Sequence, residues 1–283
     1  MNSSLRLVFL LAILSLLSCK EQSLQEKHLY YEDGSIRQII QYTEKYDTTT
    51  FRLIEFLQNG DTLLICDFKN NAQHGLYKGF YPNNMVKVKS HYQNGKQHGL
   101  TRFYIQNSGF LTKEILYIEG KPITHAIYGS VDDTLSGISY YYSHLEKEND
   151  TLSFFGSLSF NTRGELVDLM SSYFLVNAEE KVKAGEPLLI TIKFVMGLYN
   201  DIDYELQLGD FNKDLAFTDS SKVILYKSTG RDLSFEFKDY NYGYNLILGK
   251  IKLYKSNIQG PITYVKHPYI NEYFFYHQFE VIK

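Results

Sequence analysis

Three oxygen-bearing side chains alternate in the segment from residue 210 to residue 214. Asp210, Asn212 and Asp214 have the spacing with which calcium-binding loops begin. Leu215 stands where such a loop requires glycine, and Ser221 stands where a carboxylate would complete the ligand set. The segment therefore favours a turn held by side-chain hydrogen bonds to the backbone, and we expect no resident metal or cofactor.

Two histidines, His74 and His98, occupy matching places 24 residues apart, each directly before a glycine, Gly75 or Gly99. Imidazole is a common metal ligand, so a shared metal site or a binding face is one interpretation. No carboxylate or thiol recurs beside the two histidines. The other interpretation, which we favour, places each histidine at a turn, where its ring covers an aromatic side chain of the neighbouring hairpin.

Three tyrosines, Tyr240, Tyr242 and Tyr244, alternate with asparagine and glycine. These residue types combine rigid contact area with adaptable hydrogen bonding, as they do in antibody loops. This tyrosine cluster is the candidate recognition site, and its rings could stack on sugars. The alternative is a hairpin turn whose rings cover the edge of a β-sandwich.

Motifs of the common catalytic sites are missing from the sequence. It contains no Gly-x-Ser-x-Gly elbow, no His-Glu-x-x-His, no P-loop and no dinucleotide fingerprint, so we expect a protein that is not an enzyme. The alternative is a carbohydrate- or envelope-active enzyme, because glycoside hydrolysis needs only two carboxylates that a fold can bring together. A net charge of −3 without a basic cluster argues against nucleic acid as a partner.

Residues 1–18 have the features of an export signal. A basic residue precedes an apolar run, residues 7–17, which as a helix would rise about 16 Å and is too short for a hydrocarbon core of about 30 Å. The run ends in Leu16-Leu-Ser18-Cys19, which resembles the lipobox of bacterial lipoproteins. The resemblance implies cleavage between Ser18 and Cys19 and a lipid on the Cys19 thiol.

A lipid on Cys19 implies a location and a membrane partner. Two or more acyl chains hold a protein on a bilayer almost permanently, because each buried methylene contributes about 0.8 kcal/mol. Residues 19–27 are polar, and we expect them to form a tether. The expected location is the bacterial cell envelope, in the outer membrane, with the periplasmic and surface faces both open. A secreted protein without the lipid is the alternative.

A short pattern recurs along residues 28–129. The segment Phe68-Lys-Asn-Asn-Ala-Gln-His-Gly75 is followed, 24 residues on, by Tyr92-Gln-Asn-Gly-Lys-Gln-His-Gly99. A unit that is two strands long predicts stacked hairpins, because a single hairpin is only marginally stable. Tight turns need positive φ, which is supplied by glycines that follow Asp, Asn or Glu, namely Gly34, Gly95 and Gly120.

These units resemble the MORN repeat, in the bacterial variant that reads Tyr-x-Asn-Gly-Lys-x-His-Gly. The resemblance covers about 100 residues, and the final unit loses the His-Gly pair near His125, as a capping repeat would. It implies an elongated, twisted antiparallel sheet that serves as a scaffold for binding. Proteins with this variant often carry the label "antitoxin component", which does not suit a chain with a lipobox.

Composition and the second half of the chain complete the expected architecture. With 25 Tyr, 19 Phe and no sustained 3.6-residue periodicity, the chain should be all-β. Six or seven strands are predicted after residue 176, and their spacing resembles that of an immunoglobulin-like sandwich. The expected divisions are a signal peptide (1–18), a tether (19–27), a repeat sheet (28–176, with clear repeats to about 129) and a β-sandwich (177–283).

Together these features predict a lipid-anchored, non-enzymatic protein of the cell envelope. It would present an elongated sheet of MORN-type hairpins and a C-terminal β-sandwich to a protein or a glycan. Cys66 is the one cysteine besides Cys19, and it lies in an apolar run. We therefore expect Cys66 to be a small core residue without a disulfide partner in the chain.

Overall fold

The computed structural model describes residues 25–42, 47–132, 134–143, 152–167, 172–196, 202–212, 216–228, 230, 232–255 and 273–283. The expected signal peptide, Cys19 and Asp214 lie outside these residues. Within them the chain is built almost wholly of strands, in one long antiparallel sheet and two smaller sheets, which confirms the all-β prediction. In the part of the chain so described, no helix is long and apolar enough to cross a bilayer.

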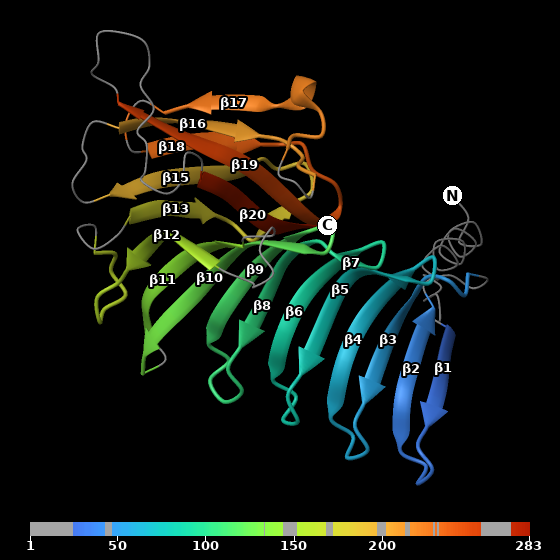
Figure 1. The fold of residues 1–283 in the computed structure, drawn as a ribbon. Helices are drawn as coiled ribbons and strands as arrows, with labels where there is room; N and C mark the ends of the chain where they lie inside the picture. Colours follow the sequence, from blue (N-terminus) through green and yellow to red (C-terminus); the bar gives the residue numbers. More distant parts are fainter. Residues whose placement is uncertain are drawn as a thin grey trace, which may run out of the picture.

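The long sheet contains twelve strands that lie side by side in chain order (Figure 1). Consecutive strands pair antiparallel, except that the two-residue β7 lies beside the main path and β6 pairs directly with β8. β1 already begins at Gln25, so the last residues of the expected tether belong to the sheet. The strands are β1 (Gln25–Tyr30), β2 (Ile36–Tyr42), β3 (Phe51–Phe56), β4 (Thr62–Lys69), β5 (Ala72–Phe80), β6 (Val86–Gln93), β7 (Lys96–Gln97), β8 (Gly99–Tyr104), β9 (Leu111–Ile118), β10 (Lys121–Val131), β11 (Thr134–Ser143) and β12 (Leu152–Ser159).

Backbone hydrogen bonds between hairpins repeat with the sequence. The Gly95 N–H donates to the Gln73 carbonyl at 2.8 Å, and one unit later the Gly120 N–H donates to the Gln97 carbonyl at the same distance. Gly95 and Gly120 have φ of 79° and 85°, a region that glycine adopts without steric cost. Each turn is therefore bonded to the preceding hairpin, which explains why the turn chemistry recurs with the unit.

The glutamine of each Gln-His-Gly motif directs its side chain to an equivalent small residue. Gln73 Nε2 lies 3.5 Å from Cys66 Sγ, and Gln97 Nε2 lies 3.4 Å from Ser90 Oγ. Cys66 is 2% exposed and Ser90 is 1% exposed. Burial raises the pKa of the Cys66 thiol to about 11, so Cys66 is an uncharged residue of the sheet interior.

The second unit is a β-sandwich of a three-stranded sheet, ordered β13-β15-β18, and a five-stranded sheet, ordered β14-β20-β19-β16-β17. Side chains from both sheets, among them Ile190, Tyr204 and Phe279, are at most 1% exposed and form one core. β13 belongs to the sandwich, so the border expected at residue 176 falls inside a strand. The strands are β13 (Ser172–Ala178), β14 (Lys181–Lys183), β15 (Leu188–Met196), β16 (Ile202–Leu208), β17 (Ile224–Lys227), β18 (Asp232–Phe237), β19 (Gly243–Lys255) and β20 (Tyr273–Ile282).

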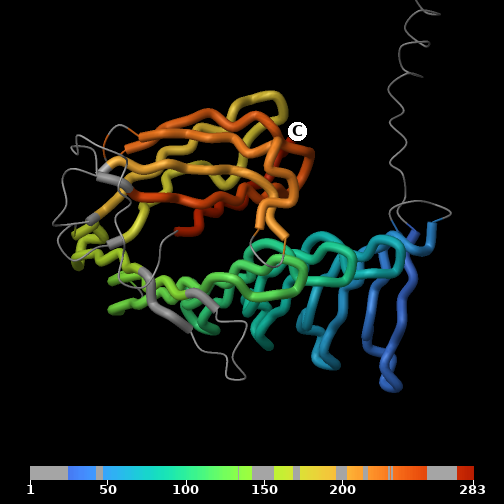
Figure 2. The backbone as a smooth tube through the Cα atoms, turned by 45° about the horizontal axis from the view of Figure 1, so that its top comes forward, coloured from blue at the N-terminus to red at the C-terminus, as the bar shows by residue number. Residues whose placement is uncertain are grey.

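The sandwich lies over the β8–β12 half of the long sheet, while β1–β3 extend beyond it (Figures 1 and 2). β20 makes polar contacts with the long sheet: Gln278 Oε1 accepts from the Leu100 N–H at 2.8 Å, and the Tyr276 hydroxyl lies 3.3 Å from Glu114 Oε1. Leu100 also packs in one apolar cluster with Phe211 of the sandwich. The two units therefore share a buried boundary, and two hollows lie along it.

Candidate functional site

A groove with a volume of about 410 Å³ lies where the turns of the long sheet meet the tip of the sandwich. We call it the rim groove. His74, His91 and His98 line it from the sheet, and Tyr242 and Tyr244 line it from the sandwich. None of the described residues that line it is Asp, Glu, Lys or Arg. The fold thus brings the repeat histidines and part of the tyrosine cluster to one uncharged hollow.

The Gln278 side chain determines which ring nitrogen of His91 carries the proton. Its Oε1 accepts from the Leu100 N–H, so its Nε2 is the end that faces His91 Nδ1, at 3.2 Å. Because an amide nitrogen only donates, Nδ1 accepts and the imidazole proton is on Nε2. Burial, with smaller contributions from Lys89 and Arg102, lowers the pKa of His91 to about 4, so the ring is neutral at pH 7. His91 Nε2 is buried and has no hydrogen-bond partner among the described residues.

Lowering the pH from 7 to 4.5 is expected to destabilise the protein by about 2 to 3 kcal/mol through His91. Its folded pKa of about 4 lies below the ordinary value of 6.5, so the unfolded chain takes up a proton first, and stability present above pH 6.5 is lost as the pH falls toward 4. Burial also lowers the pKa of His98 and of His277, which act in the same direction. Urea unfolding at both pH values should show a smaller loss in His91→Gln, and an equal loss would contradict this assignment.

Tyr244 covers His91 at the inner end of the rim groove. The two ring centroids are 3.9 Å apart, and Lys89 Nζ lies 5.8 Å from the centre of the Tyr244 ring. Tyr242, two residues earlier, is 59% exposed. One tyrosine is therefore held in place by its neighbours, and the other is free to meet a ligand.

Tyr240 and Asn212, which the sequence also singled out, form hydrogen bonds that hold turns of the sandwich. The Tyr240 hydroxyl accepts from the Gly185 N–H and donates to the Glu186 carbonyl, so Tyr240 joins two turns of the sandwich and does not line the rim groove. In the segment that begins at Asp210, for which the sequence favoured a turn, Asn212 Oδ1 accepts from the Ala216 N–H at 3.1 Å, which is turn geometry. Among the residues described, no group of three His, Cys, Asp or Glu is placed to hold a metal.

Gly99 shows why its motif ends in glycine. A Cβ at Gly99 would lie 2.8 Å from Gln278 Oε1, so a larger residue would displace the amide that orients His91.

Asp210, the first residue of the segment considered for calcium, contributes its backbone carbonyl, which accepts from the Thr218 N–H in the turn that precedes β17. The remaining predicted turn glycines all have positive φ: Gly34, Gly75, Gly95 and Gly120.

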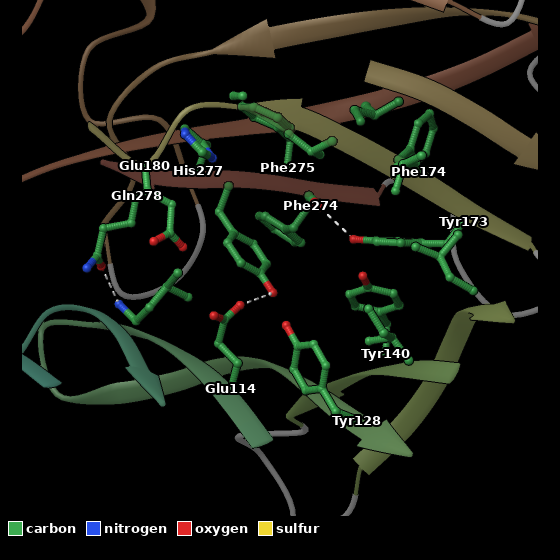
Figure 3. A pocket seen from close by; sticks show the side chains of 18 of the residues that line it. Glu114, Tyr128, Tyr140, Tyr173, Phe174, Glu180, Phe274, Phe275, His277 and Gln278 are labelled. Carbon is green, nitrogen blue, oxygen red and sulfur yellow. Dashed lines mark hydrogen bonds between the residues drawn. The ribbon is translucent and has the colours of Figure 1, made fainter. Parts of the chain in front are cut away.

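A second hollow, with a volume of about 290 Å³, lies deeper between the long sheet and the sandwich (Figure 3). We call it the aromatic pocket. Tyr140 and Tyr173 stack across the boundary with ring centroids 3.9 Å apart, which joins the two units at its floor. The Tyr and Phe rings that line the pocket are Tyr128, Tyr140, Tyr173, Phe174, Phe274, Phe275 and Tyr276.

The aromatic pocket also holds a buried ion pair. Arg102 Nε lies 2.7 Å from Glu114 Oε2, and the two side chains are 18% and 7% exposed. Glu180, which is 71% exposed, lies 3.3 Å from Arg102 Nη2. Burial of Arg102 disfavours its charge, but the two carboxylates outweigh burial and leave the pKa of Arg102 above its ordinary value.

Glu114 and Glu180 are two carboxylates that the fold brings to one pocket, as the enzymatic alternative requires. Both contact the same Arg102 guanidinium. An ion-paired carboxylate does not supply the protonated general acid that glycoside hydrolysis needs. The arrangement therefore suits binding better than hydrolysis.

Sequence reasoning missed His91, Gln278 and the Arg102–Glu114 pair. One indication was available for His91: the equivalent position of the preceding unit is Asp67, so His91 departs from the repeat. Gln278 lies 187 residues from His91, and no local pattern connects them.

Comparisons with known proteins do not identify a family for this chain. No family model matches the chain, and no curated protein matches it. A solved structure of a substituted form of S. aureus TarM, in complex with Fondaparinux, alpha-GlcNAc-glycerol and UDP, aligns at 15% identity over 40% of this chain and 23% of that chain, with a TM-score of 0.26. The chain thus spans less than a quarter of that protein, and the low TM-score does not indicate a shared fold.

Proposed function

We propose that this chain is a lipid-anchored, non-enzymatic binding protein of the bacterial cell envelope, whose ligand lies in the rim groove. The observation that carries the proposal is the composition of that groove, where histidines of the repeat sheet meet Tyr242 and Tyr244 of the sandwich without a charged side chain. Binding sites commonly combine aromatic walls with a few placed polar groups. His98 and Asn245 are such groups, because both line the groove and are partly exposed.

A neutral glycan is the ligand that these side chains favour. Sugar rings present C–H faces that pack on tyrosine and hydroxyls that accept from or donate to imidazole and amide groups. His91 is neutral at pH 7, and burial lowers the pKa of His98 as well, so the rim groove does not attract a charged peptide. The exposed ring of Tyr242 is available for contact with a sugar face.

The proposed anchor and location rest on the lipobox-like sequence that ends at Cys19. A diacylated cysteine would place the chain on the outer membrane, and strand β1 would begin only a few residues from the lipid. The rim groove would then lie close to envelope glycans.

Tyr244→Ala is expected to weaken glycan binding about tenfold or more, because it removes an aromatic wall of the rim groove. An array of envelope glycans, probed with soluble residues 20–283, would identify the ligand, and calorimetry would measure the affinity. Tyr30→Ala is the matched control, since Tyr30 is a 56% exposed tyrosine on β1, away from the groove. Failure to bind any glycan, or an equal loss in both variants, would refute the proposal. A protein captured by the wild type and lost in Tyr244→Ala would reassign the ligand class.

The second candidate is an enzyme that acts on carbohydrate or on the cell envelope, and the observation in its favour is the pairing of Glu114 and Glu180 in one pocket. Mass spectrometry of glycans incubated with the protein separates the two functions. Our proposal expects intact glycans. Cleavage that is abolished in Glu114→Gln would establish the enzyme instead.

A further inference from the structure

We propose that the aromatic pocket binds a small organic cation, an alkylammonium or quaternary ammonium group on an apolar body. The pocket is distinct from the rim groove and shares only Gln278 with it among the described lining residues, so the inference goes beyond the proposed function. A volume of about 290 Å³ is at the lower end of the range for small-molecule sites. Three properties of its lining lead to the cation.

The first property is the balance of charge. Arg102 carries one positive charge, and Glu114 and Glu180 carry two negative charges, which leaves the lining with a net charge of −1. His277 adds no charge at neutral pH, because burial lowers its pKa. Arg102 is already engaged by both carboxylates. An anionic ligand would therefore meet unfavourable charge, whereas a cation would restore neutrality.

Charged side chains of both signs lie just outside the lining of the pocket. Lys89 lies within electrostatic reach of Glu180 and Glu280, and Lys181 Nζ lies 3.7 Å from Glu280 Oε2, so charges of both signs lie outside the lining. Burial lowers the pKa of Lys89, and Arg102 acts on it in the same direction. The charges that line the pocket itself are those of Arg102, Glu114 and Glu180.

The second property is the aromatic wall. The hydroxyl ends of Tyr128 and Tyr140 point into the space beside the Glu114 carboxylate, and the Tyr173 hydroxyl donates to the Phe274 carbonyl at 3.0 Å (Figure 3). Burial raises the pKa of Tyr128 and of Tyr140, so these hydroxyls stay neutral and their oxygens can face a positive group. Phenolic oxygens carry lone pairs, so they present partial negative charge to a cation in the pocket.

The third property is the gradient of exposure from the mouth of the pocket to its interior. Glu180 is 71% exposed, whereas Glu114 is 7% exposed and accepts from the Tyr276 hydroxyl. Glu180 is therefore placed to attract a cation from solvent and Glu114 to hold it inside. The apolar side chains Ile138 and Leu158, which line the same pocket, would contact the uncharged body of the ligand.

Calorimetry with choline as the probe tests the charge requirement. Soluble residues 20–283, which contain every described residue, should bind choline in a saturable way. The neutral isostere 3,3-dimethylbutan-1-ol should bind about tenfold more weakly or worse, because it has the same shape without the charge. Acetate should show no binding. Equal binding of choline and the isostere, or no binding of choline, would overturn the inference.

Glu180→Gln tests the site itself. We expect about a fivefold or greater loss of choline affinity with an unchanged melting temperature, since Glu180 is mostly exposed. Glu236→Gln is the control, because Glu236 is an exposed carboxylate on β18 that does not line the pocket. Choline affinity that is unchanged in Glu180→Gln would overturn the inference. Glycan binding in the rim groove should be the same in all three proteins, so a failure here leaves the proposed function intact.

Discussion

Replacing Glu114 with glutamine is expected to lower the free energy of unfolding by about 3 kcal/mol. The substitution preserves the shape of the side chain but leaves the Arg102 guanidinium, 18% exposed, with only the solvent-exposed Glu180 as a counter-ion. Removing one partner of a buried ion pair typically costs about 3 to 5 kcal/mol, and Glu180 compensates for part of that cost. Urea unfolding followed by tyrosine fluorescence measures the change, because the chain has 25 Tyr and no Trp.

An ion pair on the open part of the sheet is the matched control. Arg52 and Asp67 are also a cross-strand pair at 2.7 Å, but their side chains are 47% and 26% exposed. Asp67→Asn should cost less than about 1 kcal/mol. The double variant Arg102→Met with Glu114→Gln should recover most of the loss, since no buried charge remains. Similar losses in Glu114→Gln and Asp67→Asn would contradict the role given to burial.

The repeat sheet was predictable because its determinants are local. Each tight turn needs a residue that tolerates positive φ. Gly34 and Gly164 meet this need in two different hairpins, and each donates the same kind of backbone hydrogen bond across its turn. The Gly34 N–H donates to the Tyr31 carbonyl at 3.0 Å, and the Gly164 N–H donates to the Asn161 carbonyl at 2.9 Å. The sequence of β-hairpins can thus be followed past the clear repeats as far as β12.

The structure differs from the expected borders at two places. Residues 25–27 are polar and exposed, so they were predicted to be part of a tether, yet their backbone pairs with β2. β13 reads as a further repeat strand, yet it pairs with β15. Polar side chains indicate which residues contact water. Strand pairing depends instead on the backbone N–H and C=O groups, which polar residues also carry.

The candidate sites were less predictable than the fold. The Arg102–Glu114 pair follows from the β8–β9 register, in which the two residues are directly opposite, and it could be derived once the intervening turn was located. The Gln278–His91 contact depends on how the sandwich docks on the long sheet. No periodicity contains that information, because docking is decided by the complementarity of two complete surfaces.

Replacing Cys19 with alanine is expected to move the protein from the membrane fraction to the soluble fraction. The lipid proposed on Cys19 is the membrane attachment that this substitution removes. One acyl chain binds a bilayer only marginally, whereas two bind it almost permanently, so loss of the modified thiol should change retention from nearly complete to nearly absent. Fractionation of cells that express the wild type or Cys19→Ala measures membrane retention. Metabolic labelling with a fatty acid measures attachment of the lipid.

Cys66→Ala is the matched control for that experiment. Cys66 is the other cysteine of the chain, is 2% exposed and has its pKa raised by burial to about 11, so it is a poor acceptor for lipid. Cys66→Ala should therefore remain labelled and membrane-bound. Retention of Cys19→Ala on the membrane, or loss of label from Cys66→Ala alone, would show that the lipobox-like sequence does not anchor the protein.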